Sequence, residues 1–194
     1  MNPLQIVSLA LGTGFSSGLN LYATVVTLGV LQRTGVIHLP DSMRGLANLW
    51  VIGIAGVLYA IEFAADKVPY VDTIWDALHT FIRPPAAAVL AYAAAGSAAP
   101  EWRWGAALLA GGVALTSHGA KASARAAANV SPEPFSNWTL SVGEDVLAVG
   151  LSWMAAAHPA VTIVLVITLI ALAAFLLFHL FRFARTALEK VLDS

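Results

Sequence analysis

The sequence contains no cysteine, few charged residues and no run of basic residues. The lack of cysteine excludes disulfides, thiolate metal sites and cysteine nucleophiles. The formal net charge is -1, and without a basic run it gives no sign of a nucleic-acid partner. Ser16, Ser17 and Ser117 have no convincing His/Asp setting and no GxSxG elbow is expected, so the sequence does not predict a soluble hydrolase site.

The sequence is instead rich in hydrophobic residues and contains a long uncharged run. Only 11% of the 194 residues are charged and 59% are hydrophobic, with a mean hydropathy of +0.78. Soluble domains carry roughly 25% charged residues, so this balance indicates a membrane protein. Residues 160–178 form 19 positions without a charge. As a helix that rises about 1.5 Å per residue, they are long enough to cross the roughly 30 Å of hydrocarbon.

Further apolar stretches separate polar breaks and predict a bundle of about six membrane segments. The other stretches are at about 4–31, 46–65, 86–99, 104–120 and 143–157. We therefore expect an all-α, polytopic membrane helix bundle that forms one integral membrane domain over residues 1–194. The stretch 86–99 would rise only about 21 Å as a helix. Residues 70–83 must then either help to cross the membrane or lie at its interface.

Basic residues are distributed unevenly around these segments. One side holds Lys67, Lys121, Arg125, Arg182, Arg185 and Lys190, and the other holds Arg33, Arg44 and Arg103. Because Lys and Arg are enriched in cytoplasmic loops, both termini are expected in the cytoplasm. The start of the chain has no basic n-region, so we interpret it as a retained helix and not as a cleaved signal.

Two stretches share an order of parts that suggests an internal repeat. Residues 53–96 and 111–157 each contain a glycine-flanked apolar run, polar residues, a proline-containing break, a tryptophan segment and an alanine-rich helix. Parallel repeats of this kind occur in transporters. Identities between the two are few, and a chance match of two alanine-rich helix pairs explains them as well. The helix at 158–190 would then lie at the periphery of the site.

Residues 70–83 have the pattern of one amphipathic helix. Asp72, Asp76, His79 and Arg83 follow the spacing i, i+4, i+7, i+11 and fall within an arc of about 60° at 100° per residue. Pro84 and the proline after it are expected to end this helix, because proline cannot donate a backbone hydrogen bond. Upstream, Glu62 and Asp66 form a second pair at i, i+4.

The cost of placing charges in lipid limits where the charged face of residues 70–83 can lie. An unpaired charge at the bilayer centre costs roughly 2.5–3.5 kcal/mol, so four of them facing lipid would cost about 10 kcal/mol or more. One interpretation is a solvated loop and an interfacial helix whose charges meet headgroups. The other is a polar site between helices, in which Asp72, Asp76 and His79 hold a divalent cation or exchange protons. Arg83 or Lys67 would then neutralise spare negative charge.

A second set of polar residues follows in the second candidate repeat. His118, Lys121 and Arg125 share a helix face at i, i+3, i+7, and Glu144 and Asp145 come later. If the two units pack together, this cationic face could pair with the carboxylates of residues 62–66. The alternative is a basic cytoplasmic end that sets orientation.

The first apolar segment contains small and polar residues within its length. Gly14 and Gly18 form a small-xxx-small face, extended by Gly12, at which another helix can approach closely. A homo-oligomer through this face is one possibility. Asn20 and Tyr22 supply hydrogen-bonding groups near mid-membrane, where an unwound or close-packed helix could line a site.

These motifs together resemble a known family. The stretches "GLNLYATVVTLGVLQRTGVIHLP" and "GVLYAIEFAADKVPYVDTIWDALHTFIRPPAAAVLA" are similar to a bacterial membrane family catalogued as domain of unknown function 4126. The resemblance implies a compact multi-pass protein of the bacterial inner membrane and no established activity. Its signature positions correspond to Gly18, Asn20, Tyr22, Glu62, Asp66, Lys67, Asp72, Trp75, Asp76, His79, Thr80 and Arg83.

Three functions fit the sequence. We expect first a transporter or channel for an ion or small solute, because intramembrane ionisable groups and broken segments are typical of such sites. The predicted site residues are Asn20, Tyr22, Glu62, Asp66, Asp72, Asp76, His79, Arg83, His118 and Lys121. One alternative is a structural or assembly subunit whose charged stripe binds a partner. The other is a metal-dependent enzyme acting on a lipid phosphate, with the metal on the two aspartates of the stripe.

Overall fold

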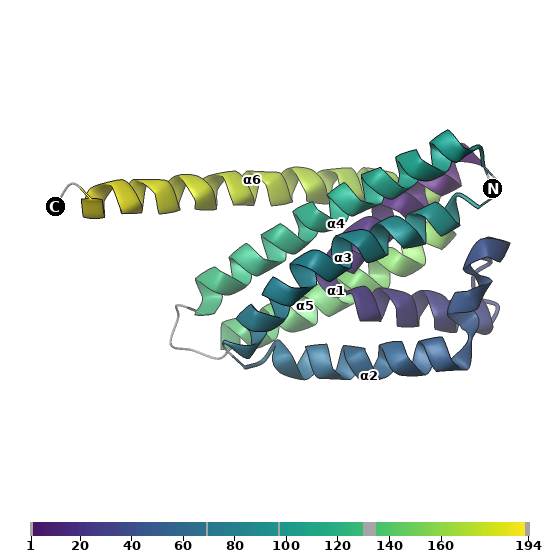
Figure 1. Ribbon diagram of the computed structural model, residues 1–194, viewed down its shortest axis with the longest axis horizontal. Helices are drawn as coiled ribbons and strands as arrows, with labels where there is room; N and C mark the ends of the chain where they lie inside the picture. The colour runs from purple at the N-terminus through teal and green to yellow at the C-terminus, as the bar shows by residue number, and fades with distance from the viewer. Residues whose placement is uncertain (1, 69, 97, 130–134, 193–194) are drawn as a thin grey trace.

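The computed structural model describes residues 2–68, 70–96, 98–129 and 135–192, and within them every regular element is helical. The elements are α1 (Pro3–Arg33), the short 3-10 helix η1 (Asp41–Ala47), α2 (Leu49–Ala65), α3 (Val71–Ala94), α4 (Pro100–Asn129), α5 (Phe135–Ala157) and α6 (Pro159–Leu192). The prediction of an all-α helix bundle is confirmed. Figure 1 shows α3, α4 and α5 packed around α1, with α2 and α6 on the outside.

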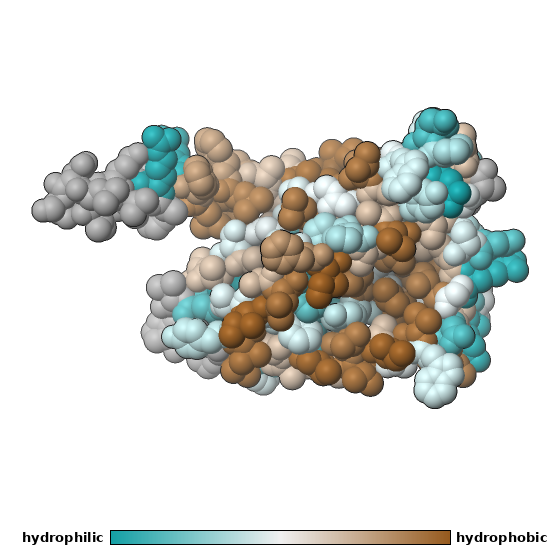
Figure 2. Space-filling model, viewed as in Figure 1, coloured by the Kyte–Doolittle hydropathy of each residue, from teal (hydrophilic) through white to brown (hydrophobic). Residues whose placement is uncertain are grey.

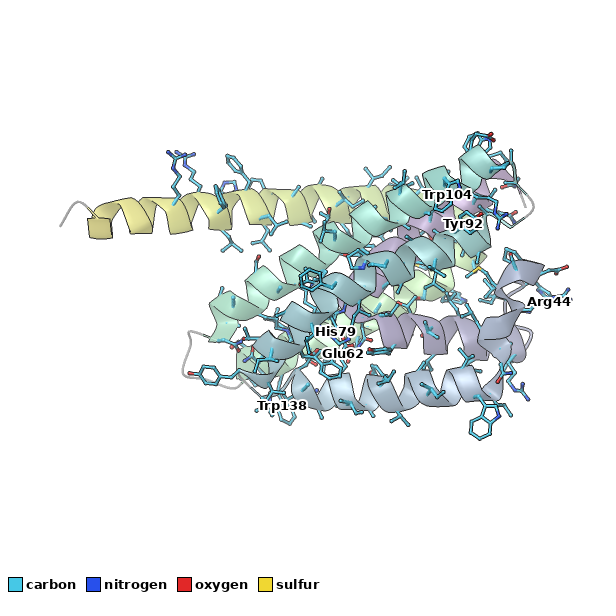
Figure 3. All side chains as sticks on the ribbon, in the orientation of Figure 1. Arg44, Glu62, His79, Tyr92, Trp104 and Trp138 are labelled. Carbon is cyan, nitrogen blue, oxygen red and sulfur yellow. The ribbon has the colours of Figure 1, made fainter. Side chains whose placement is uncertain are left out.

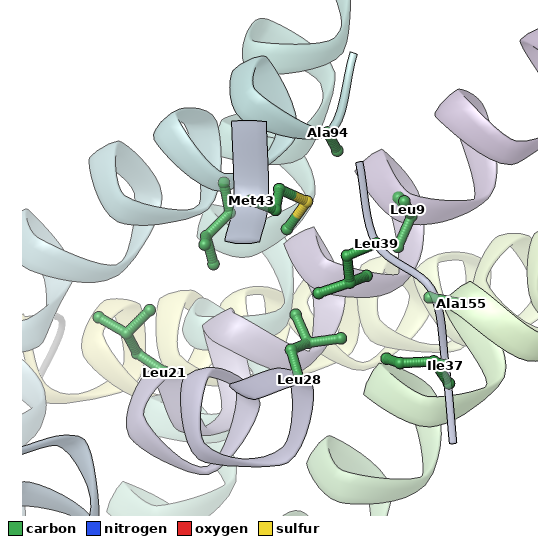
Figure 4. Close-up of a cluster of buried hydrophobic side chains, with 9 residues drawn as sticks. Leu9, Leu21, Leu28, Ile37, Leu39, Met43, Ala94 and Ala155 are labelled. Atoms are coloured by element: carbon green, nitrogen blue, oxygen red, sulfur yellow. The ribbon is translucent and has the colours of Figure 1, made fainter. Parts of the chain in front are cut away.

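Helix α1 is broken and folds back on itself. Asn20 has extended backbone angles (φ -151°, ψ 102°) inside an otherwise helical run. Leu9, before the break, shares one buried cluster with Ile37 and Leu39, which follow the end of α1 (Figure 4). Both ends of α1 therefore lie at the same end of the bundle (Figure 1). The two halves, 3–19 and 21–33, would be about 26 and 20 Å long, so neither spans the hydrocarbon alone.

This fold-back sets the directions of the later helices. By length and composition, α1, α5 and residues Pro159–Arg182 of α6 could each cross a membrane, and η1 with α2 forms a fourth candidate, bent by 62°. Because α1 returns to its own end, the five later α-helices place the end of α6 opposite the start of α1 (Figure 1). The placement of the two termini relative to the membrane stays a prediction.

Helix α3 does not end at its prolines. It continues through Pro84 and Pro85 to Ala94, so the predicted stop before them is wrong. An interior proline costs about 3 kcal/mol in a helix. Beyond the prolines, Ala87 and Ala91 are fully buried in an alanine cluster with residues of α1 and α4, and this packing opposes the cost. The 24-residue helix is about 36 Å long, enough to span.

The outer surface is apolar over the middle of the bundle. Side chains such as Val57, Phe81, Leu108 and Val146 are exposed. Figure 2 shows hydrophobic residues across the central part of one face and hydrophilic residues gathered toward the end that holds the start of α1. A large exposed apolar surface of this kind suits contact with lipid. The chain is thus a polytopic membrane protein.

Glycines allow α1 and α4 to approach closely. A Cβ on Gly14 would lie 2.9 Å from the Ala110 carbonyl oxygen, and a Cβ on Gly18 would collide with the Ala114 backbone. The close approach predicted from the small-residue spacing is therefore made by α4 of the same chain. A dimer through this face would require α4 to leave it.

Residues 14–18 also match the GxSxG pattern of hydrolases, but the setting is different. A nucleophile elbow places its serine on an exposed strand-to-helix turn. Ser16 instead lies buried inside α1, where its hydroxyl donates to the Thr13 carbonyl oxygen and accepts from Ser152. The pattern here belongs to helix packing.

Replacing Gly18 by alanine tests this packing. The added methyl group has no space against α4, and overpacking of this kind costs about 1–3 kcal/mol of unfolding free energy. Gly112 is the matched control, because it is exposed on α4 and a Cβ there meets nothing within 4 Å. Gly112→Ala should be neutral or stabilising by up to about 1 kcal/mol. Thermal unfolding in detergent measures both, and equal shifts for the two variants would contradict the assigned contact.

Candidate functional site

The predicted polar residues meet in one buried cluster between helices. α2 supplies Glu62, with Asp66 as its C-cap; α3 supplies Asp72, Asp76, His79 and Arg83; α4 supplies His118, Lys121 and Arg125; α5 supplies Glu144 and Asp145; and the break in α1 supplies Asn20, with Tyr22 beside it. In Figure 3, Glu62 and His79 lie close together in the interior, whereas Arg44 and Trp138 lie at the outside. The interpretation of residues 70–83 as an interfacial helix facing headgroups is wrong, because its charged stripe faces other helices.

Lys121 is the centre of the cluster. Its Nζ lies 3.1 Å from the Leu19 carbonyl oxygen, 3.2 Å from an Asp66 oxygen and 3.4 Å from a Glu62 oxygen. Oxygens of Glu144 and Asp76 follow at 3.6 and 3.9 Å. The pairing of a cationic α4 face with the carboxylates of α2 is therefore present. Because Lys121 is buried, it is not an orientation signal at the membrane surface.

Arg125 joins three helices one turn further along α4. Its Nη2 lies 2.6 Å from Glu144 Oε2 on α5 and 2.9 Å from Asp66 Oδ2 at the end of α2. Nη1 donates to the Asp66 carbonyl oxygen at 2.7 Å and lies 3.7 Å from Asp72 Oδ1 on α3. These are charge-assisted contacts with fork geometry, which are the stronger kind of hydrogen bond.

Arg83 links α3 to α1, α2 and α4. Its Nη2 lies 2.7 Å from Glu62 Oε1, and its Nη1 donates to the Gly18 carbonyl oxygen at 2.9 Å and to His118 Nδ1 at 2.8 Å. Because a guanidinium can only donate, His118 Nδ1 must accept. His118 Nε2 then carries the proton and lies 3.0 Å from the Asp76 carbonyl oxygen. His118 is therefore neutral in this arrangement.

The break in α1 is held by these same residues. Without a helical turn at Asn20, the Gly18 and Leu19 carbonyl oxygens are free to accept from Arg83 and Lys121. Asn20 Oδ1 accepts from the Ala23 amide at 2.9 Å, as an N-cap does for the second half-helix. Its Nδ2 donates to Asp145 Oδ1 at 2.9 Å. The second oxygen of Asp145 accepts from the Tyr59 hydroxyl at 3.2 Å.

The predicted metal ligands do not converge. Among the described residues, no group of three His, Asp or Glu side chains could hold a metal ion. His79 Nδ1 lies 2.8 Å from the Trp75 carbonyl oxygen, and its Nε2 lies 3.0 Å from the Tyr22 hydroxyl, so both ring nitrogens have protein partners. As the side chains stand, Asp72, Asp76 and His79 do not form a metal-binding group. His79 instead ties α3 to the second half of α1.

The model of the family described as domain of unknown function (DUF4126) matches residues 7–179. The chain belongs to this family. No curated protein and no solved structure matches this chain.

The cluster of this DUF4126 protein holds more carboxyl groups than cationic side chains. Of the described residues, six carboxylates are buried (Glu62, Asp66, Asp72, Asp76, Glu144 and Asp145) against three cations (Arg83, Lys121 and Arg125). Several carboxylate oxygens also have no hydrogen-bond partner: Glu62 Oε2, Asp66 Oδ1, Asp72 Oδ1 and both oxygens of Asp76. A buried charge without compensation costs several kcal/mol, so this site is suited to take up further positive charge.

Some cluster members of the DUF4126 protein were not among the predicted site residues. Arg125, Glu144 and Asp145 are charged and buried, and Asn129 donates to Asp72 Oδ2 at 3.2 Å. A signal for the first three was available, since they are the remaining charges within the spans of α4 and α5 that cannot face lipid. Asn129 gives no such signal, because a neutral amide at a helix end is ordinarily solvated.

Proposed function

We propose that this DUF4126 protein transports an ion or small charged solute across the membrane through the buried cluster. The observation that carries the proposal is the break of α1 at Asn20, which opens backbone carbonyl groups onto a site with surplus carboxylates. Transporters build their binding sites from such discontinuous helices near mid-membrane. Ionisable residues in a membrane interior mark pathways of ions and protons.

Burial favours a transporter over the other candidates. The side chains of Asp76, Arg83 and Lys121 are at most 5% exposed, as in an occluded state that opens to one side at a time. A stripe that binds a partner subunit would instead face outward. An enzyme acting on lipid phosphate would need Arg83 free for the phosphate, whereas Arg83 bonds to Glu62, Gly18 and His118.

Asp76→Asn tests the transport role. Asp76 accepts no hydrogen bond in its side chain, and its nearest cations lie 3.6 and 3.9 Å away, so a neutral side chain of the same shape should fold normally. We expect the purified variant to keep its melting temperature and to lose transport in proteoliposomes. The measurement is the current or tracer flux driven by gradients of Na⁺, K⁺, H⁺ and charged metabolites. Glu101→Gln, exposed at the start of α4, is the matched control and should transport normally.

Flux through the wild-type protein tests whether the protein transports at all. If its proteoliposomes show no more flux than protein-free liposomes across this panel, transport is contradicted. If Asp76→Asn transports as fast as the wild type, the cluster is not the pathway.

A further inference from the structure

The surroundings of the Lys121 Nζ resemble the coordination shell of a cation. Five oxygens lie within 4 Å of it, one from the backbone break in α1 and four from carboxylates on α2, α3 and α5. An ammonium group has three protons to donate, so it cannot bond to all five. Oxygens that converge from four elements on one point are what an oxygen-ligated ion requires.

Two further observations point to a ligand at this place. Asp76 is 4% exposed, its Oδ1 lies 3.9 Å from the Nζ, and neither of its oxygens has a hydrogen-bond partner. Glu62, fully buried in the same shell, has Oε2 without a partner. The unpartnered oxygens belong to the carboxylates that already surround the ammonium. The cluster therefore has the free carboxylate oxygens to bind a second cation, or a cation that replaces the Lys121 ammonium.

The spacing of the shell limits which cation fits. Oxygens lie 3.1–3.9 Å from the Nζ. Zn²⁺ and Mg²⁺ need ligands at about 2.0–2.2 Å, and Ca²⁺ needs them at about 2.3–2.6 Å. With Lys121 in place, no three acidic or histidine side chains among the described residues form a group that could hold a metal ion. A large monovalent cation, similar in charge and size to an ammonium group, suits the spacing better.

We propose that the Lys121 ammonium is a tethered occupant of a monovalent-cation site, and that an alkali cation takes its position during transport. Lysine carries its charge on a flexible four-carbon stem, so it can leave and return without unfolding α4. The cation would bind to the Leu19 carbonyl oxygen and to the carboxylates of Glu62, Asp66, Asp76 and Glu144. This inference rests on the proposed transport function and names its substrate class.

Removing the tethered ammonium gives a direct test. The purified Lys121→Ala variant is melted in NaCl, KCl, RbCl or N-methyl-D-glucamine chloride at equal ionic strength, the last being too bulky to enter. We expect one alkali cation to raise the melting temperature by about 3–6 °C when present at ten times its Kd. Wild type should show a smaller shift, because Lys121 competes for the position. Arg44→Ala, at an exposed ion pair of η1, should show the same small shift as wild type.

A second variant guards against loss of folding. Lys121→Ala/Asp76→Asn removes one positive and one negative charge and leaves three carboxylates and the Leu19 carbonyl oxygen around the position. It should also show a cation-specific shift. Equal melting temperatures of both variants in all four salts would overturn the proposal. Failure of both to fold in every salt would do the same, because a bound cation is expected to restore the missing charge.

Failure of the cation site and failure of the transport proposal give different results. Cation-specific stabilisation of Lys121→Ala without any flux through the wild type would support the site and contradict transport. Flux through the wild type without cation-specific stabilisation of either variant would support transport and contradict this site.

Discussion

Replacing Arg125 by methionine is expected to lower the free energy of unfolding by about 3–5 kcal/mol. Arg125 makes four hydrogen bonds to Asp66 and Glu144 and lies near Asp72. Methionine fills similar space but leaves these buried carboxylates without their cation. The cost comes from the uncompensated charges and not from lost packing. Unfolding in detergent, followed by circular dichroism, measures the change.

Two comparisons make this result specific. Arg44 is 69% exposed in its ion pair with Asp41, so Arg44→Met should cost less than about 1 kcal/mol. Adding Glu144→Gln to Arg125→Met should recover part of the loss, because one stranded carboxylate is then neutral. If the double variant is less stable than Arg125→Met alone, uncompensated charge is not the cause.

The helices were predictable because apolar length is a local property. The runs at 104–120, 143–157 and 160–178 each lie within a helix of the structure, and most of the run at 46–65 forms α2 (Leu49–Ala65). The end of α3 was not predictable from Pro84, because burial of Ala87 and Ala91 against α1 and α4 opposes the proline's cost. That packing depends on residues far away in the sequence. The proposed repeat of 53–96 and 111–157 stays a prediction.

The sequence predicted most of the residues that form the site, but not which of them contact one another. The spacing of Asp72, Asp76 and Arg83 places them on one face, and the cost of facing lipid requires partners. Which partner each residue meets depends on how closely the helices approach. The central place of Lys121 follows from the contact of α4 with α1 at Gly18, and from the free Leu19 carbonyl oxygen. Neither is readable from spacing within one helix.

The sequence signalled an unwound or close-packed helix at Asn20, but it did not predict that α1 folds back there. No proline marks the break, and the residues after Asn20 are as apolar as those before it. The conformation is held by groups from other helices: Arg83 from α3, Lys121 from α4 and Asp145 from α5. The break and the charged cluster therefore depend on each other. A change at Asn20 should disturb both.

Asn20→Ala is expected to destabilise the protein by about 2–4 kcal/mol. It removes the N-cap of the second half-helix, worth about 0.5–2 kcal/mol, and leaves Asp145 Oδ1 without its donor, worth about 1–3 kcal/mol. Asn20→Asp should be worse, although aspartate caps helices as well as asparagine does. Its carboxylate would face Asp145 inside a cluster that already has surplus negative charge.

Asn48 provides a matched control for this order. It is exposed and caps α2 by accepting from the Trp50 amide at 2.8 Å, and among the described residues no hydrogen bond joins its side chain to a buried carboxylate. There the ranking should reverse, with Asn48→Asp close to wild type and Asn48→Ala lower by about 1 kcal/mol. Melting temperatures of the four variants test the argument. If aspartate is tolerated better than alanine at Asn20 as well, capping alone explains Asn20 and its bond to Asp145 does not hold the break.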